Sequence, residues 1–241
     1  MEKLFEELDY QPTPLGELSL RRRKIAMLDN EVVYEVILNQ EFLMSSLFHA
    51  AEDALAHRAL SLLDAHAADI VVGGLGLGYT AAAALEYAWV TSLTVVEFLK
   101  PVIDWHQRGL LPILPAPAHD PRATLVEGDF FALAAAGQGF NPSQPKAKAN
   151  AILLDIDHTH KHWLHPRHAG FYTPVGLAAL REALHPDGIF AMWADGDPDT
   201  EFVQMLTGVF GSAEGCRIEF SNPITEATSA STIYLAGLRV G

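Results

Sequence analysis

The stretch that most constrains the fold is residues 69–80, where an apolar strand runs into a glycine-rich turn. It reads Asp-Ile-Val-Val-Gly-Gly-Leu-Gly-Leu-Gly-Tyr-Thr, and an alanine-rich segment follows. Gly74, Gly76 and Gly78 recur at every second position, so the backbone can turn sharply and approach a ligand closely. The helix expected next would present free backbone N–H groups to that ligand. The pattern predicts a strand–turn–helix unit that binds a nucleotide.

After Asp69 the sequence alternates apolar strand-like segments with helix-like segments. The predicted strands cover 70–73, 93–97, 124–127, 151–155, 188–193, 217–221 and 232–238. The first five show little polar alternation and are followed by helical patterns, which indicates a parallel sheet covered on both faces. The connection between the last two strands is too short for a helical crossover of normal size, so that pair is expected to be antiparallel.

The residues before this region have the pattern of short strands joined by turns. A helix capped by Ser45 or Ser46 is expected to run to about His66 and to lead into the main domain. We therefore expect a small β-hairpin subdomain at 1–45 and a Rossmann-like domain at 46–241.

Composition limits the classes of partner. The chain has 241 residues, of which 16 are basic and 30 acidic, and its formal net charge of −14 repels a nucleic acid backbone. No apolar run approaches the roughly 20 residues of a membrane span, and the first residues lack a basic segment followed by an apolar one. We expect a cytoplasmic protein that binds neither nucleic acid nor membrane. Small neutral or cationic substrates suit this charge.

The glycine motif alone fits two classes of nucleotide-binding protein. Gly76-x-Gly78-x-x-Ala81 satisfies a relaxed dehydrogenase fingerprint, and Glu97 could bind a ribose in either class. Three features weigh against NAD: the Gly-x-Gly-x-Gly spacing, the Glu-Gly-Asp that ends at Asp129, and the lack of a second mononucleotide-binding half. With its antiparallel ending, the chain resembles the class I S-adenosylmethionine-dependent methyltransferase fold, a mostly parallel seven-stranded sheet with an antiparallel last strand.

An ordered series of short motifs resembles spermidine synthase-like proteins over nearly the whole chain. The series starts with Tyr-Gln-Pro-Thr-Pro-Leu-Gly at Tyr10 and ends with Phe171-Tyr172. The motifs between them are Glu52-Asp-Ala-Leu-Ala-His57, Val72-Gly-Gly-Leu-Gly, Val96-Glu97, Glu127-Gly-Asp129 and Leu154-Asp155.

This resemblance implies a donor site. Gly74, Gly76 and Gly78 would hold the sulfonium nucleoside, Glu97 would bind the ribose hydroxyls, and Asp129 would bond the adenine amino group. The implied cofactor is S-adenosylmethionine or its decarboxylated form. The implied partners are a small-molecule acceptor and a second copy of the chain in a homodimer.

The resemblance also implies which residues face the acceptor. Asp155 lies where the family faces the reacting centre, and Tyr172 matches a tyrosine whose hydroxyl contacts substrate, although a half-buried structural tyrosine is an equal interpretation. Asp53 and His57 are one helical turn apart and either face the site or form an ordinary surface pair. Together with Asp157, they are the candidate substrate-binding residues.

Two departures from the family bear on the reaction. Polyamine synthases of this family carry an aspartate in the glycine turn that helps to hold the aminopropyl amine, whereas the run Gly73–Gly78 has no carboxylate. After the fourth strand, His158 occupies the place of the family's catalytic aspartate. The unsubstituted turn suits ordinary S-adenosylmethionine, whose carboxylate would accept bonds from backbone N–H groups.

The segment 155–168 contains five of the eleven histidines. His158 is a candidate general base, because an imidazole could accept a proton from an amine, a hydroxyl or an acidic carbon. On an extended backbone, His158, His160 and His162 would lie on one side and could bind a zinc-like metal. The remaining interpretation is a solvated loop, and no metal is assigned. His106, in the second helix of the main domain, is expected on the surface.

The leading hypothesis is an S-adenosylmethionine-dependent methyltransferase of spermidine synthase-like architecture that acts on a small molecule. The alternative within the same fold is an aminopropyltransferase that uses decarboxylated S-adenosylmethionine. An alternative of another class is a non-catalytic module that binds adenosyl nucleosides.

Overall fold

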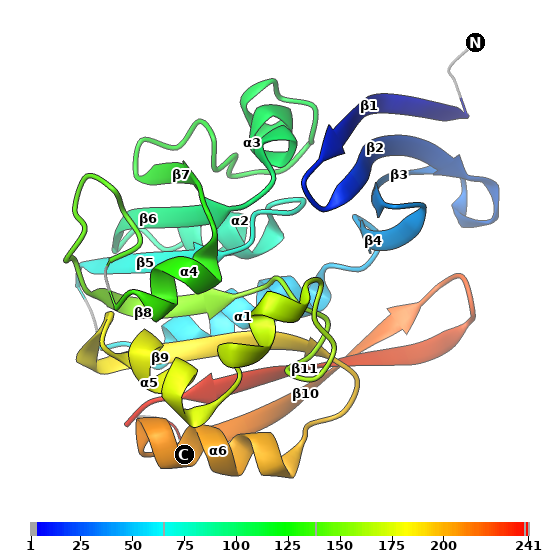
Figure 1. The fold of residues 1–241 in the computed structure, drawn as a ribbon. Coiled ribbons are helices and arrows are strands. Elements are labelled where there is room, and N and C mark those ends of the chain that lie inside the picture. Colours follow the sequence, from blue (N-terminus) through cyan, green and yellow to red (C-terminus); the bar gives the residue numbers. More distant parts are fainter. Residues whose placement is uncertain (1–3, 65, 138, 239, 241) are drawn as a thin grey trace.

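A computed structural model describes residues 4–64, 66–137, 139–238 and 240 (Figure 1). The strands are β1 (Phe5–Thr13), β2 (Gly16–Ile25), β3 (Glu31–Leu38), β4 (Glu41–Ser45), β5 (Ala68–Gly73), β6 (Val90–Glu97), β7 (Ala123–Glu127), β8 (Ala149–Leu154), β9 (Leu184–Asp195), β10 (Ala213–Asn222) and β11 (Ala227–Ala236). The helices are α1 (Ala50–Ser61), α2 (Tyr79–Leu85), α3 (Lys100–Gln107), α4 (Phe130–Ala135), α5 (Pro174–Arg181) and α6 (Thr200–Phe210), with short 3-10 turns η1 (Ala26–Leu28) and η2 (Pro166–Gly170).

The first four strands form a separate antiparallel sheet in the order β1-β2-β3-β4. Tight turns join them, and Asn30 and Asn39 adopt positive φ angles of +62° and +52° in two of these turns. The predicted group of short amino-terminal strands is confirmed.

The other seven strands form one sheet in the order β10-β11-β9-β8-β5-β6-β7. Strands β5 to β9 pair in parallel, and β11 runs antiparallel to both of its neighbours, β9 and β10. The predicted mostly parallel sheet with an antiparallel ending is confirmed. A parallel arrangement places the carboxyl ends of β5, β6, β7 and β8 at one edge, where ligands bind in sheets of this kind.

Helices cover both faces of the large sheet, as Figure 1 shows. On one face, side chains of α1, α2 and α3 pack with alternate strand residues such as Ile70 and Leu153. On the other face, α4, α5 and α6 pack with the intervening residues, such as Val71 and Ile152. Leu18 of the small sheet belongs to the first of these clusters, so the two sheets share apolar packing. The division into domains at residue 45 stays a prediction.

The first helix begins later than predicted. It starts at Ala50 after His49, which makes no side-chain cap. The hydroxyl of Ser46 instead accepts a hydrogen bond from Tyr34 N–H at 2.9 Å, and that of Ser45 accepts one from Leu47 N–H at 3.2 Å. Both hydroxyls therefore accept hydrogen bonds from backbone groups outside the helix, and neither caps it.

Candidate active site

The glycine turn joins the end of β5 to the start of α2. Gly74, Gly76 and Gly78 have φ angles of +93°, +48° and +95°, which residues with a side chain rarely adopt. The turn is also crowded, because a Cβ on Gly74 would lie 2.1 Å from the carbonyl oxygen of Asp155 and one on Gly76 would lie 2.8 Å from Met44 Sδ. Backbone conformation and close packing both require glycine here.

Glu97, the last residue of β6, is buried and braces this turn. Its Oε2 accepts a hydrogen bond from Leu75 N–H at 2.9 Å, and its Oε1 accepts one from Leu99 N–H at 2.7 Å. Burial raises the pKa of the Glu97 carboxyl, and the backbone donors offset part of that rise. The carboxylate therefore lies at the edge of the pocket in a fixed orientation.

His106 supports the other side of the turn. It is buried, so the expectation that it lies on the surface is wrong. Its Nε2 lies 2.9 Å from Gly76 O and donates the hydrogen bond, since a carbonyl oxygen only accepts. A Cβ on Gly78 would lie 2.6 Å from the imidazole Cε1. Burial lowers the pKa of His106 and favours the neutral ring.

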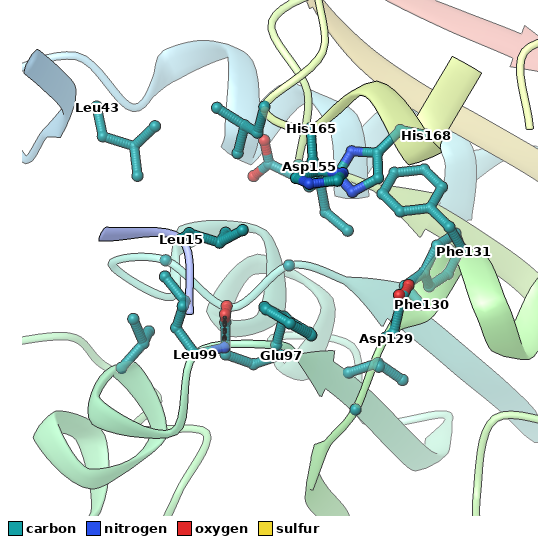
Figure 2. Close-up of a pocket in the computed structure, with 18 of the residues that line it drawn as sticks. Leu15, Leu43, Glu97, Leu99, Asp129, Phe130, Phe131, Asp155, His165 and His168 are labelled. Atoms are coloured by element: carbon teal, nitrogen blue, oxygen red, sulfur yellow. Dashed lines mark hydrogen bonds between the residues drawn. The ribbon is translucent and has the colours of Figure 1, made fainter. Parts of the chain in front are cut away.

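A pocket lies beside the turn, at the carboxyl ends of the central strands (Figure 2). Five residues predicted for the donor and the reacting centre line it: Gly74, Gly76, Glu97, Asp129 and Asp155. Apolar side chains of the small sheet close one side, namely Leu15, Leu18, Val36, Leu43 and Met44. The segment after β8 closes another side with Ile156, Leu164, His165, Arg167 and His168. The pocket is therefore lined by polar residues at the strand ends, by apolar residues of the small sheet, and by the segment after β8.

Asp129 follows β7 and caps α4. Its Oδ1 accepts a hydrogen bond from Ala132 N–H at 3.1 Å, which fixes the carboxylate at the rim of the pocket. Phe130 and Phe131 lie beside it and line the same side of the pocket (Figure 2). This corner combines a hydrogen-bond acceptor with apolar rings.

Asp155 directly follows β8 and lines the pocket (Figure 2). Burial raises the pKa of its carboxyl to about 6, although Thr80 Oγ1 donates a hydrogen bond to its Oδ2 at 2.9 Å and opposes the rise. Glu52 of α1 is a neighbour that sequence reasoning missed. Burial first, and the Asp155 charge second, raise the pKa of the Glu52 carboxyl to about 8. The charge of Asp155 therefore disfavours the ionised form of Glu52.

The sequence held a signal for Glu52. Leu55, Ala56 and Ala59 are buried on α1. Glu52 precedes Ala56 by one helical turn, so it lies on this apolar face. A carboxylate on the buried face of a helix needs a partner or a proton, and that requirement distinguishes Glu52 from the exposed acidic residues.

Asp157 and Tyr172 lie behind the pocket wall, although the first was predicted to bind substrate and the second to be catalytic. The Asp157 carboxylate is buried and accepts hydrogen bonds from Leu164 N–H at 2.7 Å and from the Tyr172 hydroxyl at 2.8 Å. His168 Nδ1 lies 2.8 Å from the same carboxylate. Burial, followed by the Asp157 charge, raises the pKa of the Tyr172 phenol well above its ordinary value. Neither residue lines the pocket, and both hold the segment after β8 in place.

The alternating histidines do not share one side, because the backbone turns between them. Thr159 Oγ1 accepts a hydrogen bond from His162 N–H at 2.9 Å and closes a turn. The rings of His158 and His162 lie 4.8 Å apart, whereas His160 Nε2 lies 3.1 Å from Asp199 Oδ2. No group of three or more metal-binding side chains occurs among the residues that the structure describes. His158, the candidate general base, does not line the pocket.

Asp53 and His57 have partners of their own on the surface. Asp53 Oδ2 lies 2.7 Å from His49 Nδ1, and His57 Nδ1 lies 3.0 Å from the Tyr87 hydroxyl. Neither lines the pocket. Their contacts match the interpretation of ordinary surface side chains rather than that of side chains facing the site.

Two solved structures share this architecture. The spermidine synthase of Thermotoga maritima aligns with a TM-score of 0.69 and 16% identity, covering 95% of this chain and 71% of that chain. A spermidine synthase in complex with the transition-state analogue AdoDATO aligns with the same score, identity and coverage. The fold is spermidine synthase-like. The resemblance predicted from the ordered motifs is therefore confirmed at the level of architecture.

Curated relatives of this spermidine synthase-like chain are methyltransferases. Putrescine N-methyltransferase 4 of Nicotiana tabacum is 26% identical over 191 residues, and the match covers 68% of this chain and 46% of the relative. Putrescine N-methyltransferase 1 of Nicotiana attenuata is 27% identical with the same coverage. The chain spans about half the length of the curated relatives it matches. No family model matches it.

The chain is thus distantly related in sequence to these enzymes and spermidine synthase-like in fold. Across the described ranges, none of its helices is long and apolar enough to cross a membrane.

Proposed function

We propose that the protein is an S-adenosylmethionine-dependent methyltransferase that acts on a small-molecule acceptor. One observation carries the proposal: a glycine turn without a carboxylate, at the end of β5, opens into the same pocket as Glu97, Asp129 and Asp155. These three residues end or follow β6, β7 and β8, which are neighbours in the sheet together with β5. The curated relatives are named for methyl transfer to putrescine, which supports the same class of reaction.

Each part of the pocket suits one part of an adenosyl sulfonium donor. The carboxylate of Glu97 would accept hydrogen bonds from the ribose hydroxyls, and Asp129 would accept one from the adenine amino group. Phe130 and Phe131 supply apolar surface for the adenine ring. The glycine turn lets the backbone approach the methionine part and places no negative side chain beside its carboxylate.

When bound, S-adenosylmethionine would supply the methyl group on an already activated sulfonium. The chain's main task is then to hold donor and acceptor in line. The acceptor must present a lone pair, so a protonated acceptor has to lose a proton. Asp155 is the residue best placed to take that proton, because it lines the pocket and burial brings the pKa of its carboxyl to about 6. This assigns to Asp155 the role that the sequence suggested for His158.

Aminopropyl transfer is the second candidate within this fold. It would use decarboxylated S-adenosylmethionine, whose amine requires a negatively charged partner in place of the donor carboxylate. The run Gly73–Gly78 offers none. A module that binds the nucleoside without chemistry is the candidate of another class.

Calorimetry followed by a transfer assay separates these candidates. We expect S-adenosylmethionine to bind more tightly than its decarboxylated form, 5′-methylthioadenosine to bind, and NAD not to bind. With S-adenosylmethionine carrying a labelled methyl group, mass spectrometry should find the label on putrescine or on another small amine or alcohol. Aminopropylated products would favour the second candidate, and binding without transfer would favour the module. Failure of all adenosyl sulfur compounds to bind would overturn the proposal.

A further inference from the structure

The peptide between Gly76 and Leu77 is at the centre of the glycine turn. Gly78 N–H donates a hydrogen bond to Leu75 O at 2.8 Å, which closes a four-residue turn around this peptide. The φ angle of Gly76, +48°, sets the path of the chain into it. The direction of the peptide's carbonyl and N–H groups therefore decides what the turn offers to a ligand.

His106 of α3 fixes the direction of the carbonyl group. Its Nε2 donates a hydrogen bond to Gly76 O at 2.9 Å, and its ring packs so closely that a Cβ on Gly78 would lie 2.6 Å from Cε1. His106 is buried and does not line the pocket, whereas Gly76 does. The Gly76 carbonyl therefore points away from the pocket, toward α3.

The N–H group of Leu77 points the other way. The peptide is trans, and in a trans peptide the carbonyl and N–H groups lie on opposite sides. A carbonyl held by His106 thus directs the Leu77 N–H to the pocket side of the turn. This N–H donates no hydrogen bond to any other residue that the structure describes. Backbone donors inside proteins are nearly always paired, so this one is suited to a ligand.

The donors that precede Leu77 in the turn are already used by Glu97. Its carboxylate accepts a hydrogen bond from Leu75 N–H at 2.9 Å. Burial raises the pKa of the Glu97 carboxyl, and backbone donors that include the Gly76 N–H oppose the rise. The Leu77 N–H is therefore the next donor along the turn that a ligand can meet.

We propose that His106 is a positioning residue that makes the site prefer a donor with a carboxylate, because it holds the Leu77 N–H toward the pocket. This inference rests on the proposed function and adds the residue that distinguishes S-adenosylmethionine from its decarboxylated form. The methionine carboxylate accepts the hydrogen bond from Leu77 N–H. The decarboxylated donor and 5′-methylthioadenosine lack that carboxylate and gain nothing from this N–H.

Two substitutions of His106 separate positioning from packing. His106→Leu removes the hydrogen bond to Gly76 O, whereas His106→Gln keeps an N–H donor on the side chain. Calorimetry on the full chain should show that His106→Leu binds S-adenosylmethionine roughly tenfold more weakly than wild type. Its affinities for the decarboxylated donor and for 5′-methylthioadenosine should stay within about twofold. His106→Gln should restore most of the preference for S-adenosylmethionine.

Ile103→Ala is the matched control. Ile103 is buried on the same helix and does not line the pocket. This variant should lose stability and keep the wild-type ratio of the three affinities. A merely structural His106 would act on all three ligands alike. Equal losses for the three ligands in His106→Leu, or an unchanged preference, would therefore overturn the inference.

NMR of the wild-type protein decides should His106→Leu fail to fold. The ring proton of ligand-free His106 must lie on Nε2, and the Leu77 N–H signal must move downfield with S-adenosylmethionine but not with 5′-methylthioadenosine. A proton on Nδ1 alone, or a Leu77 signal that S-adenosylmethionine leaves in place, would overturn the inference. If no adenosyl sulfur compound binds, the proposed function fails and donor selection fails with it, whereas the ring proton still tests the contact with Gly76.

Discussion

Gly74 is the residue at which the glycine turn is most directly testable. In Gly74→Ala, the new Cβ would meet the Asp155 carbonyl oxygen at 2.1 Å in a residue whose φ is +93°. We expect the affinity for S-adenosylmethionine to fall roughly tenfold or more, and the free energy of unfolding to fall by about 1–3 kcal/mol. Calorimetry and urea unfolding measure the two effects.

Gly109→Ala is the matched control. Gly109 also has a positive φ, +65°, but a Cβ there would meet nothing within 4 Å. This variant should lose about 1 kcal/mol of stability through the backbone alone and should keep its affinity for the donor. Equal losses of affinity in both variants would show that the turn does not contact the donor.

At the residue scale, local signals predicted part of the pocket. Glycine spacing and positions at strand ends can be read directly from the sequence. Those signals identified Gly74, Gly76 and Glu97, whereas the resemblance to spermidine synthase-like proteins implied Asp129 and Asp155. Glu52 and His106 were missed because their surroundings depend on which helix face packs against the turn. That packing is set by residues distant in the sequence.

At the scale of elements, the segment from β8 to α5 depends on one buried carboxylate. In Tyr172→Phe, Asp157 would lose a charge-assisted hydrogen bond of 2.8 Å. We expect the free energy of unfolding to fall by about 1.5–3 kcal/mol. Tyr10→Phe is the control, since Tyr10 is 49% exposed and its change should be near zero. Equal stabilities in urea unfolding would contradict this role of Asp157.

The backbone path of the same segment could not be predicted from the sequence. A metal site at the alternating histidines required an extended backbone, but the Thr159 side chain bonds to the backbone two and three residues later and closes a turn. A similar local competition moved the start of α1, since Ser45 and Ser46 bond to other backbone groups. Short polar side chains therefore decided the element boundaries in both places.

For the whole molecule, the buried carboxyl groups predict how stability depends on pH. Their pKa values are raised, for Glu52 to about 8, so the folded state binds more protons than the unfolded chain. This stability is fully present below pH 4.5 and is lost as pH rises through 8. The buried His106, with a lowered pKa, acts oppositely but only below about pH 6.5. Between pH 6.5 and 8, the free energy of unfolding should fall by on the order of 1–2 kcal/mol.

Urea unfolding of wild type at several pH values in that interval measures the slope. A free energy of unfolding that rises or stays constant would contradict the raised pKa values. The mostly parallel pairing of the large sheet and its antiparallel ending were predictable at this scale, because apolar strands followed by helices favour parallel pairing and a short connection favours antiparallel pairing. The homodimer and the cytoplasmic location stay predictions.

The pocket wall supplied by the small sheet has a consequence for motion. Met44 of β4 lies against Gly76, and four further apolar residues of the small sheet face the pocket from the same side. A donor held between the two sheets would tie them together, so local opening of β4 would become rarer while the pocket is occupied. Amide hydrogen exchange in β4 should slow when S-adenosylmethionine binds, while exchange in β10 should not change. The residence time of the donor would then be set by how often the small sheet lifts away from the turn.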